Sequence, residues 1–348
     1  MIGNHEIFMK RCLELAAMGL GNVAPNPMVG SVIVHEGKII GEGYHRRYGE
    51  AHAEVNAINS VSDKSLLKNA NLYVNLEPCA HYGKTPPCAE LIAKLQIPRV
   101  VIGSGDPNPL VNGKGTAMLK EAGCEVISNI LNDACKDLNR RFFTFQQKQR
   151  PYIILKWAET ADGYIDKIRS SDEKPQWISN EASRILVHKW RSEEQGIWVG
   201  ANTALMDNPQ LNVRDWKGAD PVRIVIDNEL TLPLNLRIFD GKQKTIVFTL
   251  KNSNLVTENV EYVKLPSDID KISFVLNHLY CNKILSVIVE GGAKLVGLLI
   301  ERNLWDEARV FQGKALFGGG ICAPGLFMPA LSESDIDGVC LRFYRNNR

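Results

Sequence analysis

The chain has 348 residues, of which 45% are hydrophobic and 23% are charged, and 41 Lys and Arg against 39 Asp and Glu give a formal net charge of +2. These values predict a soluble protein of about two globular domains, at roughly 100–200 residues each. The near-neutral balance argues against a strongly electrostatic binder of nucleic acid or of membrane surfaces. We therefore expect small-molecule partners, no nucleic acid and no membrane.

Eight cysteines are scattered along the chain, too thinly for the disulfide framework of a small secreted protein. Glu6, Lys10 and Arg11 interrupt any signal-peptide core in the first thirty residues, and no apolar run approaches the roughly 20 residues that span a bilayer. A reducing, cytoplasmic setting is the expectation, and the sequence leaves self-association into a homo-oligomer open.

The expected elements of the first half alternate between helix and strand. Apolar residues at helical spacing predict a helix over 9–20, and a hairpin over 31–34 and 38–41 is turned by Glu36-Gly37. Then follow helices over 51–58, 88–95 and 115–122 and strands over 72–76, 99–102 and 124–127. This alternation predicts a three-layer α/β/α sandwich.

A polar segment over 144–151 ends in the helix-breaking Pro151 and precedes a new apolar run. We place the domain boundary there and predict domains over 1–147 and 151–348. The second domain repeats the alternation, with helices over 181–190, 269–279 and 294–300 and strands over 152–155, 196–199, 222–226, 245–248, 285–289, 308–311 and 338–343. It is expected to be a second α/β domain.

The residues that carry chemistry in the first half are His52, Glu54, Cys79 and Cys88. One imidazole and two thiolates make a three-ligand zinc site whose fourth position can hold water. Glu54, two residues after the histidine, is placed to move protons. An H-x-E segment followed by Pro-Cys marks zinc nucleobase deaminases, although eight residues separate the cysteines here, where that signature has two. Taken singly, each residue is more often structural; together they favour zinc.

A complete dinucleotide-binding fingerprint is missing, because Gly103-Ser104-Gly105 lacks the third glycine. The better candidate is Gly291-Gly292, which follows an apolar strand and opens a helix where a phosphate could approach. A tight strand-to-helix turn explains these glycines equally well. Arg191 ends one expected helix and Arg214 closes the expected loop 200–214, and the two could converge as a phosphate clamp. Lone arginines, however, are usually solvated.

Four segments resemble the deaminase half of the bifunctional riboflavin-biosynthesis deaminase/reductase family: residues 25–30, 52–54, 77–88 and 106–109. The eight-residue cysteine gap is part of this resemblance. It implies a cytidine-deaminase-like fold acting on a diaminopyrimidinone ribosylamine 5′-phosphate. It also implies that His52, Cys79 and Cys88 bind Zn²⁺ and that Glu54 is catalytic. The implied substrate contacts are Asn26, His45, His81, Lys84, Asp106 and Asn108.

The second half resembles the reductase part of the same family, through residues 155–158, 162–163, 177–179, 199–214 and 290–292. This implies a dihydrofolate-reductase-like fold that transfers hydride from NADPH to the ribosyl C1′, opening the sugar to a ribityl chain. Asp207 would act in substrate binding or proton transfer. The implied substrate residues are Arg191, Leu211, Arg214 and Glu290, with both arginines on the 5′-phosphate. The implied cofactor residues are Lys156, Trp177, Ser179, Asn202, Thr203, Gly291 and Gly292.

Two departures and two alternatives accompany this interpretation. Asp166 stands where the family commonly has Ala, and Pro175 where it has a hydroxyl or basic residue, so local cofactor contacts are expected to differ. One alternative is a nucleoside or transfer-RNA zinc deaminase fused to a non-catalytic α/β module, which the long cysteine gap opposes. The other is a binding module with structural zinc, which would need a fourth protein ligand, and His81 is the local contender.

Overall fold

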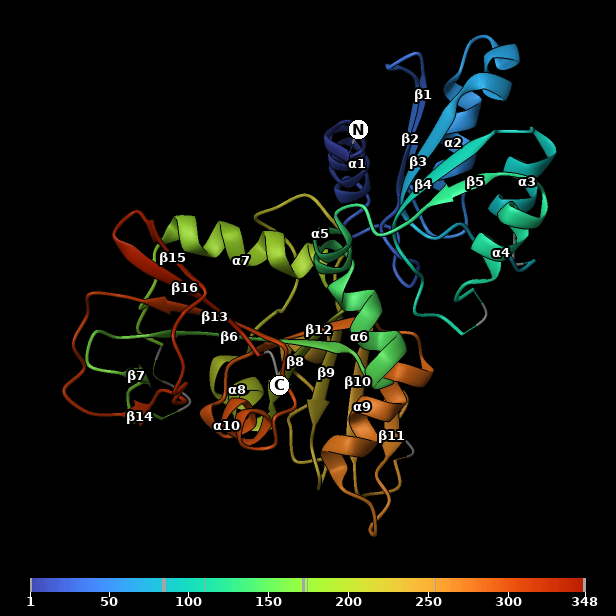
Figure 1. Cartoon of the computed structure of the whole chain (residues 1–348). Coiled ribbons are helices and arrows are strands. Elements are labelled where there is room, and N and C mark those ends of the chain that lie inside the picture. The colour runs from blue at the N-terminus through green and yellow to red at the C-terminus, as the bar shows by residue number, and fades with distance from the viewer. Residues whose placement is uncertain are drawn as a thin grey trace. The chain divides into compact units, whose positions relative to one another are not determined.

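The computed structural model describes residues 2–82, 86–109, 111–170, 173, 175–253 and 255–346. The chain divides into two compact units, Met1–Gln149 and Arg150–Arg348, which Figure 1 colours from blue to green and from green to red. Helix α6 (Arg140–Lys148) continues into the polar segment that was expected to be a connector, because three of its phenylalanines are buried. The connection between the units is correspondingly short.

The first unit is built on a five-stranded sheet. In sheet order its strands are β2 (Lys38–Tyr44), β1 (Gly30–His35), β3 (Asn71–Leu76), β4 (Arg99–Ser104) and β5 (Glu125–Ile127). β1 is antiparallel to β2 and β3, whereas β3, β4 and β5 are parallel. Glu36 at φ 49° and Gly37 at φ 75° form the left-handed pair of a type I′ turn, so the predicted hairpin is confirmed.

Helices cover both faces of this sheet. Ile33, Leu72 and Val100 pack with one set of helices, whereas Val32 and Tyr73, one residue out of phase, pack with the other. The first set contains α2 (Ala53–Ser60), α3 (Cys88–Lys94) and α4 (Lys114–Glu121), and the 3₁₀ turn η1 (Lys64–Asn69) packs on the same face. The second set contains α1 (Ile2–Ala17) and α5 (Asn132–Leu138). Because strand side chains alternate between faces, both sides are apolar, and the three-layer sandwich is confirmed.

Two glycines allow close approaches that bring the site segments against the sheet. A Cβ on Gly43 of β2 would lie 2.5 Å from the backbone nitrogen of Ala57, so α2 packs tightly on that strand. A Cβ on Gly115 would lie 2.0 Å from the carbonyl oxygen of Pro78, so the first turn of α4 touches the segment after β3. The middle of α2 is therefore held against the end of β2, and the start of α4 against the segment that follows β3.

The second unit contains a nine-stranded sheet. In sheet order its strands are β11 (Val260–Lys264), β10 (Thr245–Thr249), β9 (Val222–Ile226), β8 (Gly196–Gly200), β12 (Ser286–Glu290), β6 (Tyr152–Glu159), β13 (Glu307–Gln312), β16 (Val339–Arg345) and β15 (Ser332–Ile336). Neighbouring strands from β11 to β13 are parallel, and β16 and β15 are antiparallel additions. A separate pair joins β7 (Tyr164–Asp166) to β14 (Ile321–Cys322).

Helices again pack on both faces of this sheet. α9 (Lys271–Cys281) and α10 (Ala293–Glu301) share an apolar core with one face, and α7 (Glu181–Glu193) with the other. The expectation of a loop over 200–214 is wrong in part, because α8 (Ala201–Asp207) begins directly after β8 and buries Ala204. A short 3₁₀ turn, η2 (Arg237–Phe239), follows β9.

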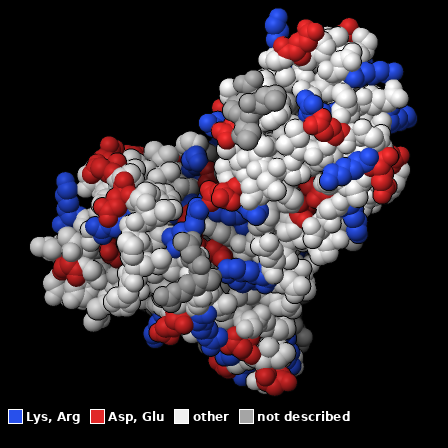
Figure 2. Space-filling view, in the orientation of Figure 1, with Lys and Arg blue, Asp and Glu red and all other residues white. Residues whose placement is uncertain are grey.

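The surface carries charges of both signs. On the face shown in Figure 2, Lys and Arg side chains lie intermixed with Asp and Glu side chains, as the near-neutral formal charge of +2 leads one to expect. None of the helices within the described residues is long and apolar enough to cross a membrane.

Candidate active sites

The three expected metal ligands of the first unit converge. His52 is the N-cap of α2, Cys79 follows β3, and Cys88 is the first residue of α3. His52 Nδ1 lies 3.5 Å from Cys79 Sγ and 3.4 Å from Cys88 Sγ. All three ligand atoms lie within 4.8 Å of one another. The cluster thus joins the starts of two helices to the end of one strand.

This donor set fits zinc. A tetrahedral ion with bonds of about 2.0 Å to nitrogen and about 2.3 Å to sulfur holds those ligand atoms about 3.5 Å apart. The two imidazole-to-sulfur distances match that separation. The hydrogen bond from Cys88, together with the neighbouring His52, lowers the pKa of Cys79, which favours the thiolate form that binds a metal ion.

Glu54 lies in the first turn of α2 and faces the same cluster. Its side chain is 3% exposed and interacts with the Cys88 thiol. Burial, followed by the nearby Cys79, raises the pKa of Glu54. A buried carboxyl group beside the metal ligands, and not among them, suits proton transfer.

Asn26 and His45 extend the cluster away from the ligands. Asn26 Nδ2 lies 3.1 Å from His45 Nε2, and the imidazole of His45 packs edge-on against His52 with ring centroids 5.4 Å apart. The other ring nitrogen of His45 lies 3.1 Å from the carbonyl oxygen of Ala51. Burial lowers the pKa of His45, so a neutral imidazole is favoured at this position.

Asp106 lies beyond the end of β4, near the same ligands. Burial raises its pKa to about 7, and the charges of Glu77 and Cys79 act in the same direction. Its Oδ1 accepts a 2.8 Å hydrogen bond from the backbone of Asn108. Asn108 is half-buried and His81 is exposed. Lys84 lies outside the described residues.

The residues that support this site escaped the sequence analysis. Asn75 accepts a 2.8 Å hydrogen bond from Gly30 N and donates one of 3.1 Å to Met28 O. Asn139 receives the Met28 N–H at 2.8 Å and donates to the same carbonyl at 2.8 Å. Two buried amides therefore fix the segment that presents Asn26. An asparagine inside an apolar strand, as Asn75 is, was the available signal.

In the second unit, Glu290 binds two cations at the end of β12. Arg191 donates to both of its oxygens, at 2.7 and 2.8 Å, and Lys156 Nζ lies 3.7 Å away. Lys156 stands beside Glu290 in the register of β6 with β12. Burial alone would raise the pKa of Glu290. The charges of Arg191 and Lys156 outweigh this effect and lower the pKa to about 2. Burial lowers the pKa of Lys156.

Gly291 and Gly292 turn the chain from β12 into α10. Their φ angles are 84° and 79°, a region that side chains rarely adopt. A Cβ on Gly292 would lie 3.0 Å from Thr203 Oγ1, so α8 packs directly on this turn. The bare backbone ahead of a helix N-terminus fits the pyrophosphate of a dinucleotide.

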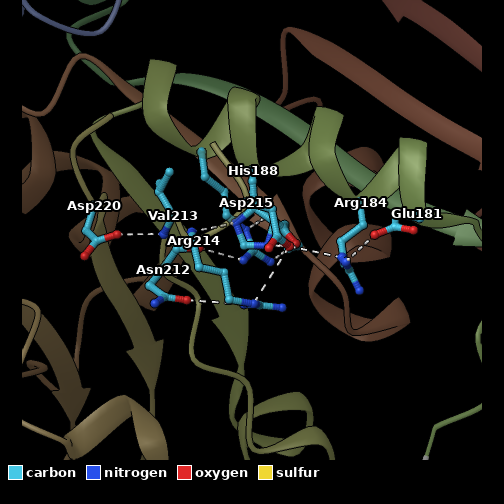
Figure 3. Close-up of polar contacts among 10 residues, drawn as sticks. Glu181, Arg184, His188, Asn212, Val213, Arg214, Asp215 and Asp220 are labelled. Atoms are coloured by element: carbon cyan, nitrogen blue, oxygen red, sulfur yellow. Dashed lines mark hydrogen bonds and ion pairs between the residues drawn. The ribbon is translucent and has the colours of Figure 1, made fainter. Parts of the chain in front are cut away.

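Arg214 belongs to a polar cluster that Figure 3 shows between α7 and the segment 212–215. Its backbone N–H donates to His188 Nδ1 at 3.3 Å, and its Nε lies 3.9 Å from Asp215. Arg191 reaches the same segment through a 3.1 Å hydrogen bond to Asn212 O. The two arginines expected to bind phosphate are thus neighbours.

Asp207 lies at the end of α8 and binds Arg169. The same guanidinium donates to both oxygens of Asp166, at 3.1 and 2.9 Å from Nε, so it bridges two carboxylates. Burial raises the pKa of Asp207, and Arg169 acts against that rise. The residue that departs from the family pattern, Asp166, is therefore linked through Arg169 to the candidate catalytic residue Asp207.

The remaining expected residues are more dispersed. Trp177 and Asn202 are exposed, and Ser179 is half-buried. Leu211 is 3% exposed and packs in the apolar core, so its side chain is not presented to a ligand. Gly313, at the end of β13, lies close to Ile178, which anchors the backbone beside Ser179.

Two family models match the chain. That of the RibD C-terminal domain covers residues 151–340, and that of the cytidine and deoxycytidylate deaminase zinc-binding region covers residues 2–104. The riboflavin biosynthesis protein RibD of Bacillus amyloliquefaciens is 43% identical over 329 residues, which cover 92% of this chain and 87% of its own. Its counterpart in Aquifex aeolicus is 37% identical over 331 residues, with 94% and 92% covered.

Solved structures match both units together. The diaminohydroxyphosphoribosylaminopyrimidine deaminase/5-amino-6-(5-phosphoribosylamino)uracil reductase of Thermotoga maritima superposes with a TM-score of 0.89 at 37% identity, covering 99% of each chain. RibD of Acinetobacter baumannii gives 0.90 at 33% identity, covering 100% of each. The expected order, a cytidine-deaminase-like domain and then a dihydrofolate-reductase-like domain, is confirmed. The chain therefore belongs to the RibD family of bifunctional riboflavin-biosynthesis deaminase/reductases.

Proposed function

We propose that the chain performs two consecutive reactions on one riboflavin precursor. The first is hydrolytic deamination of 2,5-diamino-6-ribosylamino-4(3H)-pyrimidinone 5′-phosphate, and the second is NADPH-dependent reduction of the ribosyl group to ribityl. The observation that carries the proposal is the convergence of His52, Cys79 and Cys88 beside the buried Glu54. The Thermotoga maritima relative is a deaminase and reductase of such pyrimidines, and this similarity supports the substrate class proposed here.

In the deaminase site, His52, Cys79 and Cys88 would hold the zinc ion. When bound, the ion lowers the pKa of a water molecule and makes it a nucleophile near neutral pH. Glu54 would accept a proton from that water on its carboxylate and return it to the leaving amine.

The pyrimidine would be oriented by the polar groups that border the ligands. Asn26 and His45 are hydrogen-bonded neighbours on one side, and Asp106 lies near Cys79. Because the pKa of Asp106 is about 7, its carboxyl group can donate as well as accept a hydrogen bond near neutral pH. His81, Lys84 and Asn108 are proposed as further substrate contacts from the resemblance.

In the reductase site, bound NADPH would supply the hydride that reaches C1′ of the sugar. Gly291 and Gly292, packed against Thr203, would let the cofactor phosphates approach α10. Lys156, Trp177, Ser179 and Asn202 complete the proposed cofactor side. Arg191, Arg214 and Glu290 form the proposed substrate side, where Asp207 would bind the substrate or move a proton. Leu211, whose side chain is buried in the apolar core, would contribute to that side through its backbone alone.

One incubation tests both reactions. The purified chain is given the diaminopyrimidinone ribosylamine phosphate with and without NADPH, and ammonia and NADPH are followed separately. We expect ammonia in both samples and NADPH oxidation only after ammonia release. Replacing NADPH by NADH should lower kcat/KM. Ammonia release without any later NADPH oxidation would overturn the reductase half of the proposal.

A further inference from the structure

The segment between β7 and α7 contains a buried arginine to which the proposed chemistry gives no role. The side chain of Arg169 is 4% exposed. Its Nε donates to both oxygens of Asp166, at 3.1 and 2.9 Å, and its Nη2 lies 2.9 Å from Asp166 Oδ2. A carboxylate three residues earlier in the chain therefore fixes one edge of the planar guanidinium group.

Asp166 itself stands on a fixed backbone. It is the last residue of β7, and it pairs with Ile321 of β14 (Figure 1). A Cβ on Gly320, at φ 142°, would lie 2.2 Å from Asp166 O, so the two segments touch without an intervening side chain. Just before β7, Asp162 accepts hydrogen bonds from the backbone of residues 317–318, at 3.0 and 2.8 Å. The position of the Asp166 carboxylate is thus set by the pairing of β7 with β14.

The other donors of Arg169 engage the last turn of α8. Nη2 binds Asp207 Oδ1, and Nη1 donates to Met206 O at 3.3 Å and to Glu173 O at 3.0 Å. The last carbonyl groups of a helix have no partner within it, and a cation is favoured at that end. One guanidinium group therefore holds both the backbone at the end of α8 and the side chain of Asp207.

Asp207 needs support of this kind because α8 supplies little. The helix has seven residues, buries Ala204, and is followed by Asn208 at φ 41°. The side chain of Asp207 is 34% exposed, so its own surroundings leave the carboxylate free to rotate. Binding one oxygen to Arg169 restricts the direction of the other, and a reacting group must be held in a defined direction to act efficiently.

We propose that Arg169 is a positioning residue of the reductase, held in place by Asp166, and that it orients the carboxylate of Asp207 toward the reacting substrate. The proposal rests on the reductase function proposed above. Asp166 stands where the family commonly has Ala, which has no carboxylate to fix a guanidinium group. The connection from β14 through Asp166 and Arg169 to Asp207 thus includes a contact particular to this chain.

The first test determines whether Arg169 acts through Asp207. Arg169→Gln should lower kcat/KM for reduction of 5-amino-6-(5-phosphoribosylamino)uracil roughly tenfold or more, because a charge-assisted contact is lost. In an Asp207→Asn background the same substitution should cost little more, because no carboxylate remains to be oriented. Asp166→Ala should lower kcat/KM in the wild-type chain and have little effect beside Arg169→Gln. Losses that multiply in either pair would refute the positioning role.

The second test separates charge from geometry. Arg169→Lys keeps a positive charge near Asp207 but lacks the planar fork that reaches two carboxylates and two carbonyl groups. Its kcat/KM should stay below that of the wild-type chain at every pH, while the fall at acid pH should begin near the wild-type value. Full recovery of the rate by lysine would show that charge alone is sufficient and would overturn the proposal.

The matched control is Arg342→Gln, which removes an arginine from a 2.8 Å ion pair with Glu333 in the same unit. It should reduce the substrate at the wild-type rate. Ammonia release should be unchanged in all of these variants, and thermal unfolding verifies that each is folded. If the wild-type chain released ammonia but never oxidised NADPH, the reductase function would fail and the role of Arg169 with it. If the wild-type chain is active and Arg169→Gln behaves like Arg342→Gln, only the role of Arg169 fails.

Discussion

At the residue scale, the zinc ligands were identifiable because chemistry restricts them to a few residue types at recognisable spacing. His52, Cys79 and Cys88 come from three separate elements, yet their side chains meet within 4.8 Å. The supporting amides Asn75 and Asn139 were not identifiable, because a buried asparagine has no spacing rule and acquires its partners only in the folded chain. Arg169 was missed because it too acquires its partners, Asp166 and Asp207, only in the folded chain.

Removal of one thiolate should release the metal. Cys88→Ser replaces the buried sulfur of the first residue of α3 by a hydroxyl, which is a poor zinc ligand. Elemental analysis should show most of the zinc lost, and ammonia release should fall with it. Cys124→Ser, a buried cysteine outside the cluster, is the control and should retain zinc. Full zinc content in Cys88→Ser would contradict the ligand assignment.

Arg169 is expected to set the pH range of the reductase. Burial raises the pKa of Asp207 and Arg169 opposes that rise, so Arg169→Gln should raise this pKa further. A reaction that needs ionised Asp207 is lost as the pH falls through its pKa, and in the variant that loss should begin at higher pH. The measurement is kcat/KM for reduction as a function of pH. Asp207→Asn is the reference, because without an ionisable group at this position its activity should not show the same fall at acid pH.

At the element scale, strands and helices with strong periodicity were predictable and short or exposed ones were not. The expected strand over 222–226 coincides with β9, whose three central residues are buried. β15 is polar and largely exposed, so it shows no apolar alternation to detect. α8 was taken for a loop because its seven residues bury one alanine and end before Asn208, which has a positive φ. Tertiary contacts decide such segments.

The turn before α10 offers a matched pair of glycine variants. Gly292 has φ 79° and ψ 95°, and an added Cβ would lie 3.0 Å from Thr203 Oγ1. Gly292→Ala should destabilise the unit by about 1–3 kcal/mol and raise the KM for NADPH. Gly297, inside α10, has open space around its Cβ, and Gly297→Ala should stabilise by up to about 1 kcal/mol. Urea unfolding measures the stability of both variants, and NADPH titration measures their affinity for the cofactor. Equal stability and equal NADPH affinity of Gly292→Ala and Gly297→Ala would refute the argument.

At the scale of the whole molecule, each proposed site is assembled within one unit. The predicted domain boundary rested on the polar segment 144–151, which contains no apolar strand, although the last turns of α6 lie in this segment. No motif or spacing within either unit predicts that the two units would act on the same pathway intermediate. It was accessible only through resemblance to a family in which both halves occur together.

The two activities should therefore be separable by single substitutions. Glu54→Gln should keep zinc and lose about 10²–10⁴-fold in deamination, because the proton carrier is removed and the ligands remain. The same variant should reduce separately supplied deaminated substrate at a near-normal rate. Asp207→Ala should release ammonia normally while NADPH oxidation falls. If either variant, shown to be folded, silenced both reactions, one shared active site would have to replace the two.

The two hydrogen bonds between Asn139 and Met28 also impose an order in time. The partners are 111 residues apart, and every zinc ligand is synthesised before Asn139. At about 5–20 residues per second, a ribosome would finish the ligand set some seconds before it supplies the amide that fixes the segment carrying Asn26. A nascent chain can thus acquire its metal before it can recognise a pyrimidine, and translational pausing over α5 would lengthen that interval.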